Sequence, residues 1–175
     1  MIVNKQGNLL NAKDCEVIAH QCNCFGLMGG GIAKQIKKRW NNEVFVPYRD
    51  ACNKNQDLLG KIQVLQIKDD SIRYVINLFA QYGVGHYNAP YPNGRQTDYD
   101  ALQTCLFKVK QWCKDNRVKS IGIPKYLGCG LAGGDWDGVV YPMICEFFKN
   151  DEEILLNIYE FTNNIPRKPT SLDVR

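Results

Sequence analysis

Two glycine-rich segments constrain this chain more than any other feature. The first reads Gly26-Leu-Met-Gly-Gly-Gly-Ile and the second reads Gly128-Cys-Gly-Leu-Ala-Gly-Gly-Asp. Each follows an apolar stretch typical of a strand and precedes a stretch typical of a helix. Backbone amides at such turns face outward at a helix N-terminus, where partial positive charge favours phosphate. Two such turns on one small domain predict a single ligand that carries two phosphates.

Strand-like segments recur along the chain, and helix-like segments separate most of them. Strands are expected near Ile2 and Val3 and over residues 16–22, 61–67, 72–80, 120–124 and 154–161. The third and fourth of these are expected to be neighbours, joined by Lys68-Asp-Asp-Ser71. Strands that alternate with helices predict an α/β fold with a mixed, mostly parallel sheet covered on both faces. Ligands of such sheets bind beyond the carboxyl ends of the strands, where both glycine turns fall.

Helices are expected in four places. Ile32, Ile36 and Trp40 share one face after the first glycine turn. Further helices are expected over residues 43–53 with Asn42 as the N-cap, after Thr97 as the N-cap, and over residues 135–149. Residues 81–96 are rich in glycine, proline and polar side chains, which indicates a long loop of the kind that often covers a binding site.

Length, charge and apolar content exclude several classes of protein. The 175 residues fit one domain, and the apolar runs are shorter than the ~20 residues that a membrane span needs. The N-terminus lacks a secretory pattern, so a cytoplasmic protein is expected. The net charge of +4 is mild, and the cluster Lys34, Lys37, Lys38 and Arg39 is typical of a solvated helix face. Nucleic acid is therefore not expected as the main partner.

The eight cysteines are interpreted as small buried thiols rather than disulfides. They lie inside apolar periodic segments, at positions 15, 22, 24, 52, 105, 113, 129 and 145. Cys22-Asn-Cys24 does not have the spacing of a zinc knuckle, and only His20 and His86 could add imidazole ligands. No metal site is expected.

The second glycine turn also matches a dinucleotide fingerprint. Gly128, Gly130 and Gly133 have the spacing G-x-G-x-x-G between a strand and a helix. Only one helix and one strand are expected after the turn, and Glu160 is the only distant candidate for the ribose-binding acid, so a complete Rossmann half cannot be built there. The turn also lacks the Lys and Ser or Thr of a P-loop.

The segments around both turns resemble the macrodomain, the ADP-ribose-binding module. The resemblance is carried by Ile18-Ala-His-Gln-Cys-Asn-Cys-Phe-Gly-Leu-Met-Gly-Gly-Gly-Ile-Ala and by Ile123-Pro-Lys-Tyr-Leu-Gly-Cys-Gly-Leu-Ala-Gly-Gly-Asp-Trp. It extends from Gly7-Asn-Leu-Leu to the last expected strand. It implies a three-layer α/β/α domain over residues 1–161 and leaves residues 162–175 as an expected exposed tail. His20 before the Asn-containing turn is similar to the ADP-ribose 1″-phosphate phosphatases of the yeast type.

The resemblance implies a set of ligand-binding residues. Asn8 stands where the family commonly has an acid that contacts the adenine amine, although it could equally shape a turn. Asn23 corresponds to the asparagine that meets the distal ribose. The remaining candidates are the neighbours of these residues and the two loops around the phosphates: Leu9, Gly29, Gly30, Gly31, Ile32, Gly128, Cys129, Gly130 and Leu131.

The resemblance also implies a catalytic histidine. His20 would hold the terminal phosphate and would either activate water or protonate the departing ribose oxygen. Asp135 is the first candidate for a carboxylate that positions the water, and Asp98 is the second. The alternatives are a buried structural histidine and two aspartates that only cap helices.

One related branch, which releases ADP-ribose from glutamate, differs from this chain in two places. Ala132 stands where that branch has its catalytic aspartate, and the segment after Phe79 has no lysine to form a covalent intermediate. We therefore expect hydrolysis of ADP-ribose 1″-phosphate by a monomer without metal or redox cofactor. Two alternatives stay open, namely a noncatalytic module for ADP-ribose or a related NAD-derived nucleotide, and a hydrolase that removes ADP-ribose from protein or nucleic acid.

The long loop contains four aromatic rings, those of Tyr82, His86, Tyr87 and Tyr91. One of these rings could stack on adenine or ribose, and packing on the surface is the simpler role.

Overall fold

The computed structural model describes residues 1–55 and 57–162, and its centre is a six-stranded sheet. The strand order is β1-β6-β5-β2-β4-β3, and only β3 runs antiparallel to its neighbour. The strands are β1 (Ile2–Gln6), β2 (Val17–Cys22), β3 (Ile62–Gln66), β4 (Tyr74–Phe79), β5 (Ser120–Pro124) and β6 (Leu155–Glu160). The prediction of a mixed, mostly parallel sheet is confirmed.

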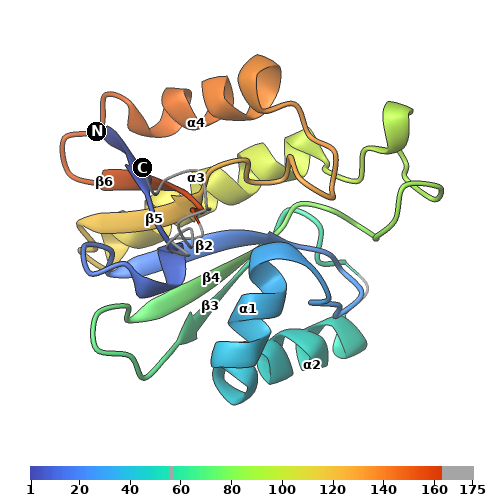
Figure 1. Ribbon diagram of the computed structural model, residues 1–175, viewed down its shortest axis with the longest axis horizontal. Helices are drawn as coiled ribbons and strands as arrows, with labels where there is room; N and C mark the ends of the chain where they lie inside the picture. Colours follow the sequence, from blue (N-terminus) through green and yellow to red (C-terminus); the bar gives the residue numbers. More distant parts are fainter. Residues whose placement is uncertain (56, 163–175) are drawn as a thin grey trace, which may run out of the picture.

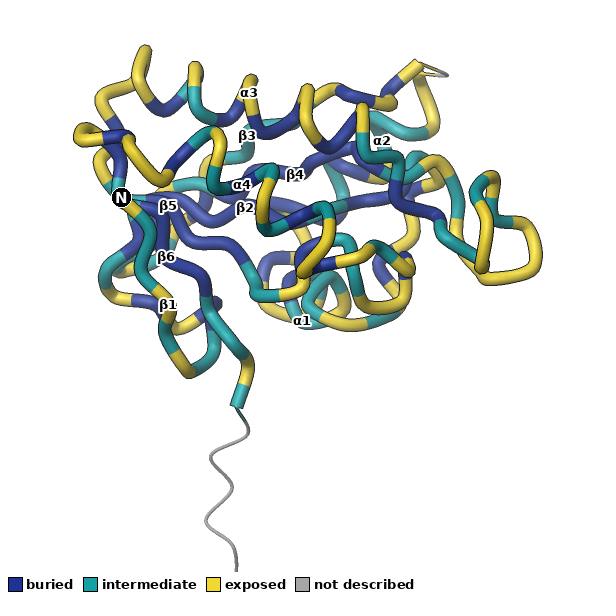
Figure 2. The backbone as a smooth tube through the Cα atoms, turned by 90° about the horizontal axis from the view of Figure 1, so that it is seen from above, coloured by how far each residue is buried: buried dark blue, intermediate teal, exposed yellow. Residues whose placement is uncertain are grey.

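Four α-helices cover the sheet in two layers (Figure 1). They are α1 (Gly31–Arg39), α2 (Val46–Lys54), α3 (Tyr99–Asp115) and α4 (Tyr141–Phe148). One core lies between the sheet and α3 and α4, with Leu102, Leu106 and Ile144 at its centre. The other core contains Ile36 of α1 and Tyr48 of α2 on the opposite face. Both faces of the central strands are therefore buried (Figure 2), and the three-layer α/β/α arrangement is confirmed.

The sheet opens where the two glycine turns leave it. β2 pairs with β5 only through Val17–Ile121 and Ile18–Gly122, so the two strands separate before their carboxyl ends. After β2 the chain continues to α1 and on to β4, whereas after β5 it continues to α4 and β6 on the other side. Such a switch point is the place where open α/β sheets bind their ligands.

Three helix starts differ from the sequence predictions. Asp98, not Thr97, is the N-cap of α3, because its side chain accepts a hydrogen bond from the Ala101 amide. Helix α2 begins at Val46 with Pro47 in its first turn, and a π-helical turn, Asn41–Phe45, precedes it in place of a helix capped by Asn42. Another π-helical turn, Trp136–Val140, precedes α4. Each π-helical turn leads directly into a helix whose first turn contains a proline.

The segment between β4 and α3 is a protruding loop, as expected (Figure 1). Its regular structure consists of a 3₁₀ turn, Pro92–Gly94, and isolated bridges between Gln81 and Thr97 and between Tyr91 and Arg95. The loop ends beside the carboxyl edge of the sheet. The predicted tail is, apart from Thr162, outside the described residues.

All eight cysteines are free; Cys15, Cys22, Cys105 and Cys113 are buried and the other four are half-buried. Among the described residues, no helix has the length and apolar content to span a membrane. The same part of the chain holds no cluster of three His, Cys, Asp or Glu side chains that could bind a metal ion.

Candidate functional site

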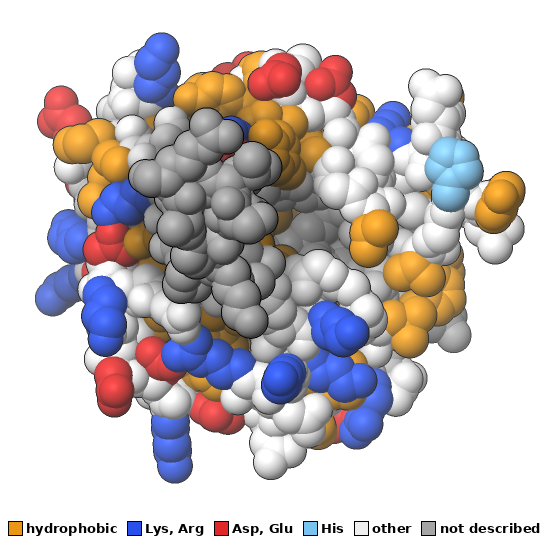
Figure 3. All heavy atoms as spheres, in the orientation of Figure 1, with side chains coloured by type: hydrophobic (Ala, Val, Ile, Leu, Met, Phe, Trp, Pro, Cys, Tyr) orange, Lys and Arg blue, Asp and Glu red, His pale blue; other side chains and the backbone are white. Residues whose placement is uncertain are grey.

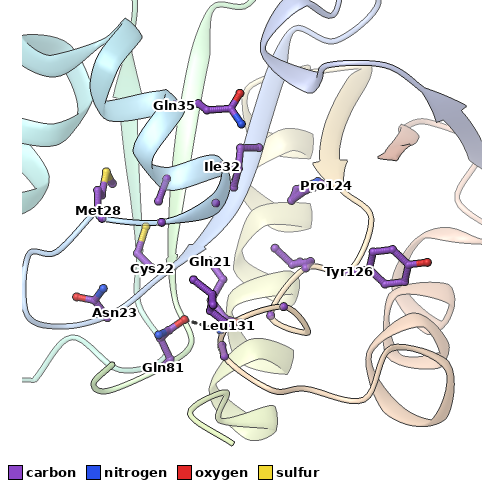
Figure 4. A pocket seen from close by; sticks show the side chains of 18 of the residues that line it. Gln21, Cys22, Asn23, Met28, Ile32, Gln35, Gln81, Pro124, Tyr126 and Leu131 are labelled. Carbon is purple, nitrogen blue, oxygen red and sulfur yellow. Dashed lines mark hydrogen bonds between the residues drawn. The ribbon is translucent and has the colours of Figure 1, made fainter. Parts of the chain in front are cut away.

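A cavity of about 950 Å³ lies between the loop that follows β2 and the loop that follows β5 (Figure 4). Both glycine turns line it. The first turn contributes residues 26–31, and the second contributes Gly128, Gly130 and Leu131. Its size is typical of a small-molecule site. The structure thus brings the two turns to one ligand cavity, as their positions in the sequence predicted.

Asn23 organises the first loop from within the cavity wall. Its amide oxygen accepts hydrogen bonds from the amides of Phe25 and Leu27, at 3.0 and 3.3 Å, and its Nδ2 donates to the Leu27 carbonyl at 2.7 Å. The buried Tyr48 hydroxyl donates to the same side chain at 2.9 Å. Asn23 is 6% exposed and lines the cavity, so it shapes the loop and faces the ligand space.

The second loop is held by a chain of amide and hydroxyl groups. The Thr97 hydroxyl donates to the Gly128 carbonyl at 2.6 Å, and the Gln21 amide donates to Thr97 at 2.8 Å. Gln21 also donates to the Gln81 side chain at 3.0 Å on the cavity wall (Figure 4). Gly128 has a φ of 69°, a conformation that glycine adopts without strain. The turn is therefore held in shape by hydrogen bonds within the protein.

The outer edges of the two loops meet. Leu131 is 88% exposed, and a Cβ added to Gly30 would lie 2.8 Å from its Cδ1. Gly30 is the N-cap of α1, whose first turn contains no acidic side chain. The free amides of this turn are suited to an anion. A diphosphate between Gly30 and Gly128 would meet backbone amides from both sides.

The far end of the cavity is formed by Asn8, Leu9, Tyr159 and Phe161. The amide oxygen of Asn8 accepts a hydrogen bond from the Leu10 amide at 3.0 Å and caps a short 3₁₀ turn, Leu9–Asn11. The turn-shaping role anticipated for Asn8 is therefore present in the structure. Phe161 is 53% exposed and offers an aromatic face at this end.

The charged side chains on the cavity wall, as far as the chain is described, are basic. Lys37 and Lys125 line the cavity, and no Asp or Glu does. Lys125 forms an ion pair with Glu160 at 3.1 Å, and this hydrogen bond raises the pKa of Lys125. Burial raises the pKa of the Cys22 thiol well above its usual value, so this cavity-lining cysteine stays protonated. The wall thus favours an anionic ligand and offers no thiolate nucleophile.

His20 does not line the cavity, which corrects its predicted catalytic position. It is 1% exposed and lies on the face of β2 that packs toward α1 and α2. Its Nε2 donates to the Asn77 amide oxygen at 2.7 Å, because the Asn77 amide group itself donates to Gln63. Burial lowers the pKa of His20 to about 4. This is the buried structural histidine that the sequence left as an alternative.

The two candidate carboxylates and Cys129 also lie off the cavity wall. Asp135 accepts a hydrogen bond from the Gly138 amide at 3.0 Å and caps the turn before α4. Asp98 caps α3 and accepts a hydrogen bond from Tyr91 at 2.6 Å. The Cys129 thiol donates to the Leu127 carbonyl at 3.2 Å, and burial raises its pKa to about 12. Capping is the observed role of both aspartates.

Several cavity residues were absent from the sequence predictions: Gln21, Gln81, Gln96, Lys125, Tyr159 and Phe161. His86 also lines the cavity, and the sequence had named it only as one of four rings that could stack on the ligand. Gln21 directly precedes the end of β2, and Gln81 and Gln96 bound the long loop. Their closeness to the carboxyl ends of the strands is a signal that the sequence could have supplied. The sequence offered no signal that separates His86 from the three tyrosines named with it.

Comparison with known proteins decides the family. The family profile described as "Macro domain" matches residues 19–143. The chain belongs to the macrodomain family. The solved macrodomain of Mycobacterium tuberculosis DarG has a TM-score of 0.77 and 29% identity to this macrodomain, with 91% of this chain and 97% of that chain covered.

Two kinds of curated relative match this macrodomain. A DNA ADP-ribosyl glycohydrolase of Mycobacterium tuberculosis is 32% identical over 148 residues, which are 84% of this chain but only 39% of that protein. An ADP-ribose 1″-phosphate phosphatase of Candida albicans is 37% identical over 130 residues, which are 69% of this chain and 75% of that protein. The two names specify different reactions.

Proposed function

We propose that this macrodomain binds ADP-ribose and hydrolyses the bond between C1″ of its distal ribose and a substituent. The observation that carries the proposal is the cavity that both glycine loops line, where their backbone amides could bind a diphosphate. In this arrangement adenine lies near Asn8 and Phe161, and the distal ribose lies near Asn23. The positive wall and the absence of an acidic side chain from its described part support an anionic ligand.

Two substituents are candidates. The first is phosphate, as in ADP-ribose 1″-phosphate, which the sequence motifs and the Candida albicans relative favour. The second is DNA, which the name of the mycobacterial relative favours, and the segment matched to that relative is longer. Because this chain spans 39% of that relative's length, the whole relative's activity is carried over only as a proposal.

ADP-ribose is expected to bind at least about tenfold more tightly than AMP, because AMP lacks the groups that would meet Asn23 and the outer phosphate. Titration calorimetry of the full chain with each nucleotide measures the ratio. Incubation with ADP-ribose 1″-phosphate and measurement of released phosphate then tests the first substituent. Equal affinities would contradict the placement of the distal ribose at Asn23. Tight binding of ADP-ribose without turnover of ADP-ribose 1″-phosphate or of ADP-ribosylated DNA would indicate a noncatalytic binding module.

His86 takes the place of His20 as the proposed acid or base. It lines the cavity on the long loop, beside Val84 and Gly85, and a Cβ added to Gly94 would lie 1.7 Å from its Nδ1. The ring therefore rests on the backbone of Gly94, at the end of the cavity where Val84 and Gln96 lie. Histidine is the side chain most often used for general acid–base catalysis, and the position of this ring on the cavity wall suits proton transfer to water or to a leaving group.

Replacement of His86 with glutamine is expected to lower kcat by about 100-fold or more and to leave the Kd for ADP-ribose within about twofold, as expected for loss of proton transfer. Initial rates and calorimetry on the same preparations separate the two effects. Tyr87→Phe is the matched control on the same loop, since Tyr87 is 98% exposed and does not line the cavity. Equal losses in kcat and affinity would assign His86 to ligand positioning instead.

A further inference from the structure

A second cavity, of about 490 Å³, adjoins the first. Leu27, Val84 and Gln96 line both cavities, so the two spaces share a wall. Leu27 belongs to the loop that Asn23 holds by hydrogen bonds, and Val84 belongs to the long loop. With the distal ribose at Asn23, as proposed above, a group attached to C1″ would point toward this second space.

Three aromatic rings line the second cavity, those of Phe25, Tyr82 and Tyr91. Phe25 and Tyr82 are 54% and 55% exposed and pack edge to face, with 5.1 Å between their ring centroids. Figure 3 shows hydrophobic side chains gathered on this side of the molecule, near the protruding loop. The face of an aromatic ring carries partial negative charge and attracts a cation placed over it.

The charged side chain on the described wall of this cavity is a carboxylate. Asp98 lines the cavity, and no Lys or Arg does. Its Oδ2 accepts a hydrogen bond from the Tyr91 hydroxyl at 2.6 Å, and its Oδ1 accepts one from the Ala101 amide at 2.9 Å. A carboxylate has about four acceptor positions, so both oxygens can accept another hydrogen bond. Among the ion pairs of the described residues, none includes Asp98. The cavity therefore favours a cation and disfavours a phosphate.

Gln96 supplies a second hydrogen-bond acceptor. Its side chain is 2% exposed, its Nε2 donates to the Gly85 carbonyl at 2.6 Å, and its Oε1 has no hydrogen-bond partner within the described chain. A Cβ added to Gly83 would lie 3.4 Å from the Phe25 ring and 3.6 Å from this oxygen. The unpartnered acceptor and the ring thus lie next to each other. An N–H donor on a ligand would satisfy the acceptor.

A guanidinium already lies over one of the three rings. The Cζ of Arg95 is 4.2 Å from the centroid of the Tyr91 ring and 4.0 Å from that of Tyr99, and its Nη1 donates to the Thr97 carbonyl at 2.6 Å. A guanidinium is planar, so it stacks on rings and donates hydrogen bonds in several directions at once, whereas an ammonium is a compact point charge. Rings, a carboxylate and a separate amide oxygen are therefore the surroundings that suit a guanidinium.

We infer that the second cavity holds the guanidinium of an arginine side chain that is joined through nitrogen to C1″ of ADP-ribose. The inference rests on the proposed function and adds arginine of a modified protein to the candidate substituents. In the reaction, the C1″–N bond breaks and its electron pair goes to the guanidino nitrogen. The oxygen of water bonds to C1″, and a proton from that water ends on the nitrogen. The products are ADP-ribose and an unmodified arginine.

The first test compares Asp98→Asn with Asp100→Asn in the full chain. Asparagine at position 98 removes the charge and keeps an oxygen that can accept from the Ala101 amide and cap α3. Asp100 is the matched control, because it lies in the first turn of the same helix and lines neither cavity. The substrates are ADP-ribose 1″-phosphate and two peptides that differ only at the modified residue, with ADP-ribose on arginine or on glutamate.

Asp98→Asn is expected to lower kcat/KM for the arginine-linked peptide about tenfold, the effect of losing a hydrogen bond to a charged group. Its Kd for free ADP-ribose and its kcat/KM for the other two substrates are expected to stay within about twofold. Asp100→Asn is expected to change none of these values by more than about twofold. The melting temperatures of both variants show that the comparison is made between folded proteins.

A second pair of variants examines the aromatic wall. Phe25→Ala is expected to lower kcat/KM for the arginine-linked peptide about fivefold, the effect of losing one ring beside a cation. Phe107→Ala is its matched control, because Phe107 is 58% exposed on α3 and lines neither cavity. The control is expected to leave the kcat/KM of all three substrates unchanged.

The outcomes separate the proposed function from the inference about arginine. If the wild-type protein does not bind ADP-ribose, the proposed function fails. If it binds ADP-ribose but does not release it from the arginine-linked peptide, only the inference about the second cavity fails. The same conclusion follows if Asp98→Asn and Asp100→Asn change the kcat/KM of that peptide equally. Faster release by the wild-type protein from glutamate than from arginine would also overturn the inference.

Discussion

The free energy of unfolding is expected to fall by about 3 kcal/mol between pH 7.5 and pH 4 because of His20 alone. Burial lowers the pKa of His20 to about 4, whereas the same imidazole in the unfolded chain titrates near its ordinary value of 6.5. The unfolded state therefore binds the extra proton first as the pH falls. The stabilisation is complete above pH 6.5 and is lost as the pH approaches 4. Urea unfolding at pH 7.5, 6.5, 5.5 and 4.5 measures this slope.

His20→Gln is the variant that isolates this effect. A glutamine amide can still donate to the Asn77 oxygen but cannot take up a proton. We expect its stability to change much less than that of the wild-type protein across the same pH range. Asp14 and Asp69 have pKa values below the usual range, so their stabilisation is lost only at lower pH. Parallel pH profiles of the two proteins would contradict the assignment.

The same variant separates a structural from a catalytic histidine. Loss of a catalytic acid or base lowers turnover by about 100-fold or more. His20→Gln at pH 7.5 is expected to keep kcat and the Kd for ADP-ribose within about threefold, because His20 does not line the cavity. A large loss of kcat with unchanged affinity would restore the catalytic assignment made from the sequence.

The fold was predictable because local signals agree with one another along most of the chain. The strand Ser120–Pro124 was expected at its observed bounds, and the apolar face of α1 at Ile36 was read from its helical spacing. Both glycine turns follow strands whose neighbours could be inferred from the alternation of elements. Helix starts were less predictable, since Thr97 and Asp98 are both good capping residues and only the packed structure selects Asp98.

Which histidine lines the cavity was not predictable for a geometric reason. Side chains alternate between the two faces of a strand, and both faces of β2 are covered by helices. His20 lies one pleat repeat before Cys22, which reaches the cavity while His20 stays in the core. Sequence spacing alone does not show where the strand stops being covered. His86 lies in a loop without periodicity, so its approach to the cavity depends on contacts such as that with Gly94.

Gly128→Ala is expected to weaken ADP-ribose binding about 100-fold, because the new Cβ has no room and the backbone conformation becomes strained. The φ of 69° costs an alanine about 1–2 kcal/mol. The Cβ would also lie 2.5 Å from Gln21 Oε1 and 3.1 Å from Thr97 Oγ1. Gln21 is held by Thr97 and Gln81 and cannot move aside freely. The loop must therefore shift away from the diphosphate position, with a loss that corresponds to about 2.7 kcal/mol.

Two other glycines provide the controls for this substitution. Gly85→Ala introduces an alanine at a φ of 93° with no atom within 4 Å of the new Cβ, so it measures backbone strain without a clash. Gly130→Ala has neither a positive φ nor a close neighbour in the protein and is expected to keep the melting temperature of the unliganded chain. Calorimetry with ADP-ribose and thermal unfolding without ligand are measured on each variant. The double variant Gln21→Ala/Gly128→Ala is expected to bind ADP-ribose more tightly than the summed losses of binding free energy of the two single variants predict. The reason is that Gln21→Ala removes the oxygen with which the new Cβ would clash. Strict additivity of the two losses would show that backbone strain, rather than the collision with Gln21, makes glycine necessary in this loop.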